Sequence, residues 1–316
     1  MKLLITGANG FIGGVLAALA GVIPDIHPIL IARRNIPLSS DTSLVLVDRI
    51  ETFTEWVQIL AGVDVVIHAA AQAHLAVQAN SHDAVDEPNA LSTKILAETA
   101  ARQGVRHFIY LSSAGVNGNV SRGRAVEETD PVQPHSSYTY SKYVGEQILK
   151  DVCSCSLMGF TCLRMPLVFG GQARGTFAQL LRFVQTVSVT PFGFVSNKRS
   201  LLFVGNLVDY LLEYAIHEPP QNEIFFIADE GVLSTRQIID LIVEGCGKRM
   251  WHLPIPPLFF KAGLYAIGKG GIYQQLFGDF YLNTRKLYLA TSWRPRYSSA
   301  EALRSVGRSL IVKKEP

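Results

Sequence analysis

Residues 2–13 read Lys-Leu-Leu-Ile-Thr-Gly-Ala-Asn-Gly-Phe-Ile-Gly, a short apolar run followed by three evenly spaced glycines. The run predicts a buried strand, and the apolar residues that follow predict a helix beginning inside the glycine pattern. Glycines at this spacing allow a tight turn and a close approach of helix to strand, and the first N–H groups of the helix favour a phosphate. The stretch predicts a dinucleotide site, and a turn that merely packs is the alternative. Its residues are Gly7, Asn9, Gly10, Phe11, Ile12 and Gly13.

Short β-rich runs alternate with helical stretches through the first half of the chain. The expected strands cover residues 2–6, 29–32, 44–47, 63–68, 106–112 and 161–164. Their nearly continuous apolar character is typical of a parallel sheet covered by helices on both faces. We therefore predict an α/β fold, a Rossmann-type doubly wound parallel sheet over residues 1–168. A smaller, less regular C-terminal substrate-binding lobe over 169–316 is expected to return some segments to the sheet.

The composition excludes several classes of protein. The 316 residues are 48% hydrophobic and 17% charged, which excludes a disordered, fibrous or disulfide-stapled chain, and a formal charge of +3 gives no support for nucleic acid as a partner. Four cysteines without metal-binding spacing indicate a reduced, cytoplasmic protein, and His68 and His74 lack acidic partners, so no metal is expected. Lys261 and Lys269 interrupt the apolar stretch 256–272, so we predict no transmembrane segment; a helix on a membrane surface is the minority alternative.

Two arginines, Arg33 and Arg34, follow the second expected strand. A dinucleotide site often carries an acidic residue here, which holds the adenosine ribose hydroxyls. Two guanidinium groups suit a 2′-phosphate instead, and the missing carboxylate removes the repulsion that would exclude one. The pattern favours NADP(H) over NAD(H), with two solvated loop arginines as the alternative.

A Tyr-x-x-x-Lys pair, Tyr138 and Lys142, begins a helix that we expect to run toward Lys150. This separation puts both side chains on one helical face, where an ammonium would lower the pKa of the phenol and make Tyr138 an acid or base at neutral pH. The strand over 106–112 leads into the hydroxyls of Ser112 and Ser113, at the sheet edge where open α/β sheets bind ligands. We expect these groups to form a catalytic constellation.

These motifs resemble those of the extended short-chain dehydrogenase/reductases of the nucleotide-sugar epimerase/dehydratase family, from Met1 to about Arg308. The resemblance implies that Tyr138 exchanges a proton with the sugar C4 oxygen, that Ser113 hydrogen-bonds this oxygen, and that Lys142 holds the nicotinamide ribose. Further matching segments are His68 to Ala71, Asn89 with Thr93, Arg164 to Gly170, Asn197 to Ser200, Asn206 to Asp209 and Trp293 to Pro295.

The resemblance also assigns binding residues. The additional cofactor residues are Asp48, Arg49, Ala69, Ala70, Ala71, Asn89, Pro166 and Val168. Besides Ser113 and Tyr138, the implied nucleotide-sugar contacts are Asn117, Thr176, Lys198, Arg199 and Gln275. Lys198 and Arg199 form the implied diphosphate clamp, with a solvated basic turn as the alternative, whereas Thr176 and Gln275 stand where relatives commonly carry Asn and Arg.

Such a family contains 4-epimerases, 4,6-dehydratases and 4-ketoreductases. Ala114 and Gly115 stand where dehydratases carry Asp-Glu, which disfavours dehydration. The arginines, together with a resemblance of 112–118 and 198–200 to bacterial O-antigen enzymes, favour NAD(P)H-dependent reduction of the C4 ketone of a UDP-4-keto-6-deoxy-hexosamine, of the UDP-N-acetylquinovosamine type, in surface polysaccharide (lipopolysaccharide) biosynthesis. The alternative is a UDP-hexose or UDP-N-acetylhexosamine 4-epimerase with tightly bound NAD, and a non-catalytic NADP(H) sensor is a minor one. The resemblance implies a homodimer formed through the helices from Ala90 and Tyr138.

Overall fold

A computed structural model of the chain describes residues 1–38, 42–72, 88–173, 175–216, 219–266, 268 and 270–312. Its centre is a seven-stranded sheet in the order β10-β6-β5-β4-β1-β2-β3, and neighbouring strands run parallel. The strands are β1 (Lys2–Thr6), β2 (His27–Ala32), β3 (Ser43–Leu46), β4 (Val65–His68), β5 (His107–Ser113), β6 (Gly159–Met165) and β10 (Glu223–Phe226). The strand order reverses between β1 and β4, and open α/β sheets bind ligands at such a point, outside the carboxyl ends of the strands.

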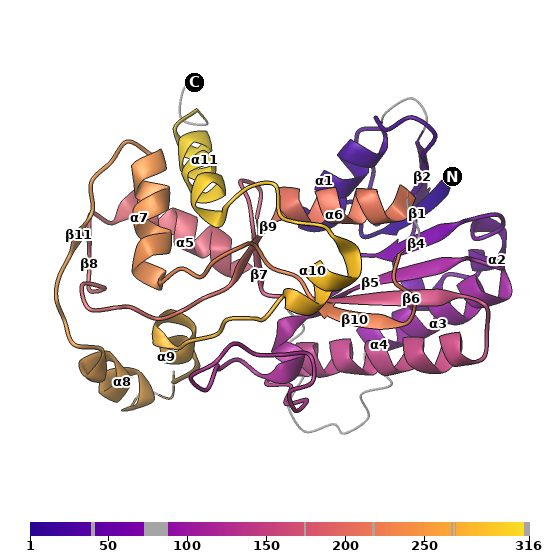
Figure 1. Cartoon of the computed structure of the whole chain (residues 1–316). Helices are drawn as coiled ribbons and strands as arrows, with labels where there is room; N and C mark the ends of the chain where they lie inside the picture. Colours follow the sequence, from indigo (N-terminus) through magenta and orange to yellow (C-terminus); the bar gives the residue numbers. More distant parts are fainter. Residues whose placement is uncertain are drawn as a thin grey trace.

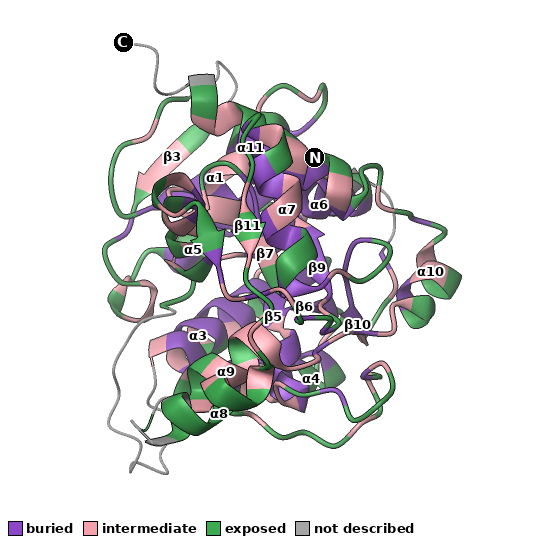
Figure 2. Ribbon diagram, turned by 90° about the vertical axis from the view of Figure 1, so that its left-hand side faces the viewer, coloured by how far each residue is buried: buried purple, intermediate pink, exposed green. Residues whose placement is uncertain are grey.

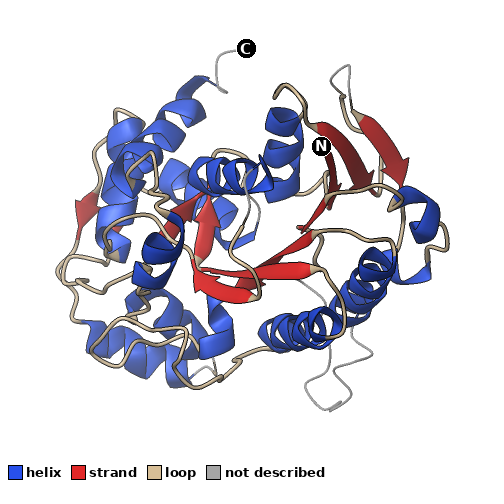
Figure 3. Cartoon of the chain, turned by 45° about the vertical axis from the view of Figure 1, so that its right-hand side comes forward, coloured by secondary structure: helices blue, strands red, loops and turns tan. Residues whose placement is uncertain are grey.

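Helices cover both faces of this sheet (Figures 1 and 3). One face carries α1 (Phe11–Ala20) and α6 (Val204–Ile216), and the other carries α2 (Trp56–Ile59), α3 (Pro88–Arg102) and α4 (Ser137–Ser154). Successive residues of a strand point to opposite faces, so Leu3 and Ile5 join the core beneath α1, whereas Leu4 joins the core beneath α3. Burial on both sides explains why the strands read as continuous apolar runs.

The predicted fold class is confirmed, and each predicted strand is present. The boundaries shift by a few residues. The strand expected over 161–164 is β6, Gly159–Met165, because the whole run is buried. The strand expected over 63–68 starts at Val65, because Val63 N–H donates to Leu60 O at 3.1 Å and so belongs to the preceding turn.

Residues after β6 build a smaller second lobe, at the left of Figure 1. β7 (Leu167–Phe169) pairs with β9 (Leu201–Phe203), and β8 (Val189–Thr190) pairs with β11 (Trp251–His252). The helices of this lobe are α5 (Gly175–Thr186), α7 (Thr235–Gly245), α8 (Pro257–Ala266), α9 (Gly270–Phe277) and α11 (Ser299–Val312). β10 and α6 return to the sheet, with α10 (Arg285–Thr291) packed beside β10. Within the described residues, we find no helix with the length and apolar character needed to cross a bilayer.

Candidate active site

The glycine turn joins β1 to α1 at the point where the strand order reverses. Gly7 has a φ of +70°, a left-handed conformation that glycine adopts without strain, and Gly10 N–H donates to Gly7 O at 2.7 Å. A Cβ on Gly13 would lie 2.2 Å from Gly7 O, so a larger residue would push α1 off the turn. Gly10 is the N-cap of α1 and no side chain caps it. The turn therefore offers backbone N–H groups and the positive end of a helix dipole, as a pyrophosphate requires.

A cavity lies over this turn, at the carboxyl ends of β1, β2, β3 and β4. The predicted cofactor residues that line it are Gly7, Asn9, Gly10, Arg33, Asp48, Arg49, Ala69, Ala70, Ala71 and Asn89. Asn9 Oδ1 accepts the N–H of Arg33 at 3.3 Å, which ties the turn to the end of β2. Phe11, Ile12 and Gly13 form the first turn of α1 behind the cavity wall. This set of residues fits a dinucleotide.

The charges around the cavity are mixed. Arg33 lines it, whereas Arg34 is exposed and lies outside its lining. Asp48 and Glu51 add two carboxylates to the wall, and Arg49 Nε pairs with Glu51 Oε1 at 2.7 Å. Of the two arginines predicted to bind a 2′-phosphate, the structure thus brings one to the cavity.

Helix α4 carries the predicted tyrosine and lysine. A capping box between Ser136 and Thr139 fixes where the helix begins, and so places Tyr138 in its first turn. Lys142 is buried, with Nζ 4.5 Å from the centre of the Tyr110 ring and 5.9 Å from the centre of the Tyr138 ring. Because Tyr110 belongs to β5, both residues of the pair lie where α4 meets the sheet.

The electrostatics of this pair differ from the sequence-based expectation. Burial raises the pKa of Tyr138 to about 12. Burial also lowers the pKa of Lys142 to about 7, although Cys162 and Glu146 act in the opposite direction. The prediction that the ammonium lowers the pKa of the phenol is wrong for this structure, because removal from water disfavours the charged form of both groups. Tyr138 is a neutral phenol here.

Ser113 ends β5 at the same edge of the sheet. Its Oγ accepts the N–H of Gly115 at 3.2 Å and so caps the short turn η3 (Ala114–Asn117). This turn packs on the beginning of α4, and His135 Nδ1 lies 3.3 Å from Gly115 O. A hydroxyl that accepts one hydrogen bond keeps its own proton to donate. Ser113 therefore offers a donor close to the start of the helix that carries Tyr138.

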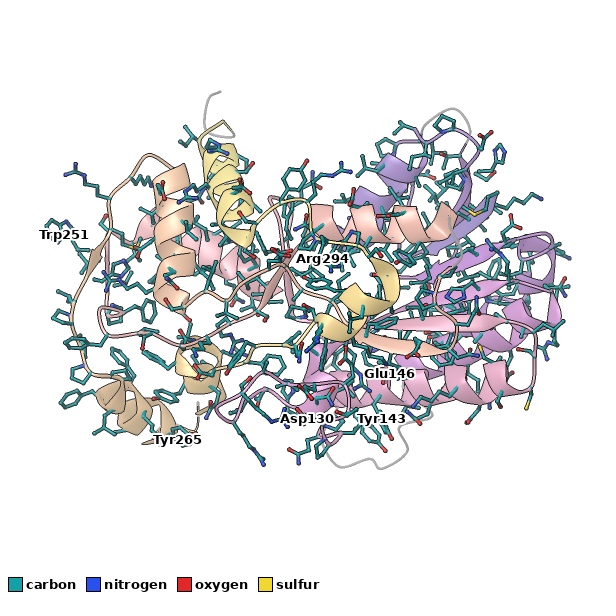
Figure 4. The ribbon with its side chains drawn as sticks, viewed as in Figure 1. Asp130, Tyr143, Glu146, Trp251, Tyr265 and Arg294 are labelled. Carbon is teal, nitrogen blue, oxygen red and sulfur yellow. The ribbon has the colours of Figure 1, made fainter. Side chains whose placement is uncertain are left out.

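Ser112 leads to a buried charged network that our sequence analysis missed. Its Oγ donates to Glu146 Oε1 at 2.6 Å, and Arg164 donates to the two oxygens of Glu146 at 2.9 and 2.5 Å. Glu146 lies on α4 (labelled in Figure 4), four residues after Lys142, and Arg164 lies in β6. Two signals could have revealed the network: a third polar residue on the face of Tyr138 and Lys142, and a charge inside an otherwise apolar strand.

Asn117, a predicted sugar contact, takes part in the same buried network. Its side chain is buried, Oδ1 accepts from Arg164 Nη1 at 2.7 Å, and Nδ2 donates to Asp130 O at 2.9 Å. Both ends of the amide are used inside the protein. Asn117 therefore holds the loop after β5 onto the sheet through Arg164, and its contact with the sugar stays a prediction.

Asn89 links the cavity to the catalytic helix. Its Oδ1 accepts the N–H of Gln72 at 2.8 Å, and its Nδ2 donates to Ser141 Oγ at 3.2 Å. Ser141 precedes Lys142 and donates in turn to Tyr138 O at 2.9 Å. Asn89 thus joins the loop after β4 to the first turns of α4.

The remaining predicted residues lie beyond β6. Pro166 and Val168 are half-buried and follow the carboxyl end of that strand. Lys198 N–H donates to Asp279 Oδ1 at 2.8 Å, and Arg199 Nη1 donates to Gly278 O at 3.3 Å, so both are fixed to the segment after α9. Burial lowers the pKa of Arg199, while nearby Asp279 raises it. The predicted contacts Thr176 and Gln275 are exposed on α5 and α9.

The candidate metal ligands do not form a metal site within the described residues, where no group of three His, Cys, Asp or Glu side chains is suitably arranged. His68 Nδ1 lies 2.7 Å from Thr6 Oγ1, and burial, with a smaller contribution from Lys142, lowers the pKa of His68 to about 3. His68 is therefore a neutral, packed side chain at neutral pH. His74 lies outside the described residues.

The chain is similar to known proteins over most of its length. The model of the NAD dependent epimerase/dehydratase family matches residues 3–228. A UDP-glucose 4-epimerase of Vibrio cholerae is 28% identical over 314 residues, which cover 98% of this chain and 95% of that protein. An N-acetyl-alpha-D-glucosaminyl-diphospho-ditrans,octacis-undecaprenol 4-epimerase of Escherichia coli O157:H7 is 24% identical over 259 residues, 81% of this chain and 76% of that protein. A solved UDP-glucose 4-epimerase of Thermotoga maritima superposes with a TM-score of 0.78 at 23% identity, over 99% of this chain and 100% of that one.

Proposed function

The chain belongs to the NAD dependent epimerase/dehydratase family, and on this premise we propose that it is a 4-epimerase of a UDP-hexose or UDP-N-acetylhexosamine that retains NAD in its cavity. One observation carries the proposal: Tyr138 and Lys142 lie on α4 at the end of the sheet where Ser113 ends β5, and Ser141 of the same helix accepts a hydrogen bond from Asn89 of the cavity wall. The Vibrio cholerae UDP-glucose 4-epimerase, similar over nearly the full length of both chains, supports the same reaction.

The reaction needs a proton to leave and return at one oxygen. NAD, when bound, supplies the reversible oxidation of the sugar C4. As the phenolate, Tyr138 would accept the proton of the C4 hydroxyl during oxidation, and the resulting phenol would return it to the C4 oxygen afterwards, while Ser113 Oγ donates to that oxygen. Since the pKa of Tyr138 is about 12 in this structure, the phenol becomes a base when positive charge lies beside it. Bound NAD in its oxidised form would supply positive charge, and Lys142, whose pKa burial lowers to about 7, would add to it when protonated.

Dehydration would need further groups. A 4,6-dehydratase requires an acid and a base near C5 and C6 of the sugar. The residues that follow Ser113 are Ala114 and Gly115, both buried in the turn η3 and without an ionisable side chain. The site therefore supports chemistry at C4 without elimination.

A 4-ketoreductase of a UDP-4-keto-6-deoxy-hexosamine is the second candidate, and one observation favours it. Arg33 lines the cavity, where a guanidinium suits the 2′-phosphate of NADP(H). A reductase consumes one reduced cofactor in each turnover, whereas an epimerase returns its cofactor to the starting state. Asp48 and Glu51 in the same wall oppose the 2′-phosphate, which leads us to rank the epimerase first.

The substrate clamp and the dimer belong to the same proposal. Lys198, with its exposed side chain, and the neighbouring Arg199 would bind the diphosphate, and Pro166 and Val168 would lie beside the nicotinamide. A homodimer would form through the outer faces of α3 and α4, where Tyr140 is 45% exposed. Light scattering of the purified chain at several concentrations tests the dimer.

The reaction is tested by incubating purified protein, without added cofactor, with UDP-glucose and separately with UDP-N-acetylglucosamine. Chromatography of the products should show the corresponding 4-epimer from at least one of them. The proposal is overturned by a lack of interconversion combined with loss of absorbance at 340 nm when NADPH or NADH and a UDP-4-keto-6-deoxy-N-acetylhexosamine are supplied. That result would establish the reductase.

A further inference from the structure

The second lobe ends in an exposed apolar surface that the proposed reaction does not use. It consists of Trp251, Leu253, Leu258, Phe259 and Tyr265, which are 73%, 50%, 71%, 70% and 51% exposed, and we call it the outer apolar face. Figure 2 shows α8 largely exposed, and Figure 4 shows Trp251 and Tyr265 at the margin of the lobe, away from the seven-stranded sheet. Leu258, Phe259 and Tyr265 lie together on α8, and large apolar side chains gathered in this way mark an interaction site more often than scattered ones do.

Helix α8 has one apolar side that is covered and another that is not. Phe260 stacks on Phe277 of α9, with ring centres 5.3 Å apart, and this contact holds α8 to the lobe. Leu258, Ala262 and Tyr265 are spaced i, i+4, i+7, which places them together on the side of the helix away from Phe260, and all three are exposed. The folding of the lobe therefore accounts for the apolar residues of one side only.

Cations predominate among the charged residues around the outer apolar face. The sequence contains no Asp or Glu from residue 245 to residue 278. Lys248, Arg249 and Lys261 are exposed there. The acidic residues that flank this stretch have partners: Glu244 Oε2 lies 2.9 Å from Arg304 Nε, and Asp279 Oδ1 accepts the N–H of Lys198 at 2.8 Å. Asp240 lies beside β11, with Oδ1 2.6 Å from His252 Nε2.

We propose that the outer apolar face binds the surface of a lipid bilayer that contains anionic phospholipid. Trp and Tyr place an apolar body and a polar tip at the level of the headgroups, Leu and Phe enter the acyl boundary, and Lys and Arg attract anionic lipids. The helix has ten residues, Pro257–Ala266, so it lies on the surface instead of spanning the bilayer. The chain would dock with this end of the second lobe on the membrane.

The charge pattern favours a lipid bilayer over a second copy of the chain as the binding partner of the outer apolar face. A symmetric contact would place Lys248, Arg249 and Lys261 of both copies close to each other, and the predominance of cations makes this unfavourable. The proposal does not depend on the proposed reaction, because neither Tyr138 nor the cofactor cavity contributes to the outer apolar face.

Vesicle flotation of the full-length chain tests the proposal. Vesicles of phosphatidylcholine with one third phosphatidylglycerol should carry the protein upward, and vesicles of phosphatidylcholine alone should carry less. The double variant Leu258→Ser/Phe259→Ser should lower the partition coefficient at least about tenfold, because two large apolar side chains no longer enter the boundary. The matched control Leu157→Ser/Leu289→Ser removes two side chains that are 104% and 74% exposed elsewhere on the chain, and it should float like the unchanged protein.

A second variant tests the electrostatic part. Lys248→Glu/Lys261→Glu should abolish the preference for vesicles with phosphatidylglycerol, because each cation near the surface contributes about 1 kcal/mol, roughly fivefold in binding. The proposal is overturned if the unchanged protein does not float, or if the Leu258/Phe259 variant and its control float equally. It is also overturned if the Leu258/Phe259 variant changes the molar mass in light scattering while its flotation is unchanged, because the face would then be a subunit contact. None of these outcomes affects the epimerase assay in solution.

Discussion

Glu146 of α4 and Arg164 of β6 form an ion pair that is withdrawn from water, with 0% and 4% of their side chains exposed and 2.5 Å between Oε2 and Nη2. Ser112 donates to the same carboxylate, and Arg164 continues to Asn117. The pair therefore joins the helix of Tyr138 and Lys142 to β6, and Ser112 links the same carboxylate to β5, the strand that ends in Ser113. This network fixes the position of α4, which carries Tyr138 and Lys142, relative to the end of β5, which carries Ser113.

Replacing one partner should destabilise the protein strongly. Glu146→Gln leaves the Arg164 guanidinium buried without a counter-charge, and loss of one partner of such a pair costs about 3–5 kcal/mol. Urea unfolding should show this loss in the free energy of unfolding. The matched control is Glu98→Gln on α3, which removes an exposed partner 4.0 Å from Lys94 and should change stability by less than about 1 kcal/mol. Equal stability of the two variants would contradict the role given to the pair.

Tyr138 should be essential for turnover but not for cofactor binding. Tyr138→Phe removes the hydroxyl that exchanges the proton, and the loss of such a group lowers the rate by about 10²–10⁴-fold. Tyr140→Phe on the same helix is the control, since this residue is 45% exposed and its hydroxyl has no part in the mechanism. Product formation and the fluorescence of bound cofactor should be measured on both variants. A Tyr138→Phe protein that turns over at the rate of the control would exclude Tyr138 as the acid and base.

The cofactor preference should depend on Arg33 and not on Arg34. If the chain accepts NADP(H), Arg33→Ala removes a charge-assisted hydrogen bond to the 2′-phosphate and should lower the affinity for NADP(H) about 10–100-fold. Binding of NAD(H), which lacks this phosphate, should change little. Arg34→Ala is the control, because Arg34 lies outside the lining of the cavity. Calorimetric titration with both cofactors measures the two affinities, and an equal loss for NAD(H) and NADP(H) would show that Arg33 does not discriminate.

Two buried histidines should make the fold sensitive to acid. Burial lowers the pKa of His68 to about 3 and that of His107 to about 4. Below pH 6.5 the unfolded chain therefore binds protons that the folded chain does not. The free energy of unfolding decreases as the pH is lowered, by up to about 1.4 kcal/mol per pH unit for each histidine. Urea unfolding at pH 7.5 and 5.5 should show a smaller loss for His107→Gln than for the exposed control His27→Gln. An equal loss of stability between pH 7.5 and 5.5 in both variants would contradict the prediction that buried His107 makes the fold sensitive to acid.

The elements that repeat a local pattern were predictable from the sequence. The strands, the glycine turn and the spacing of Tyr138 and Lys142 each depend on neighbouring residues, and the family resemblance is confirmed. The pKa values were not predictable, because they depend on how much water the tertiary structure leaves around α4. The pairing of Glu146 with Arg164 also depends on which helix meets which strand.

The contacts of Asn117 and the position of Arg34 also depend on the tertiary structure and could not be predicted from the sequence. A polar residue after a strand end is equally compatible with binding a sugar and with holding a loop, and the sequence does not show the contacts of Asn117 with Arg164 and Asp130 that hold the loop. Arg33 and Arg34 both follow the end of β2 in a bend, and only the tertiary structure shows that the cavity receives Arg33 and not Arg34.

The central claim is that C4 is oxidised and then reduced again by a cofactor that stays bound. The most direct test incubates the chain, with no free cofactor, with UDP-glucose or UDP-N-acetylglucosamine that carries deuterium at C4. The account predicts the 4-epimer with deuterium still at C4, because the same cofactor takes and returns it. Loss of the deuterium, or absence of the epimer from both substrates, would contradict the account.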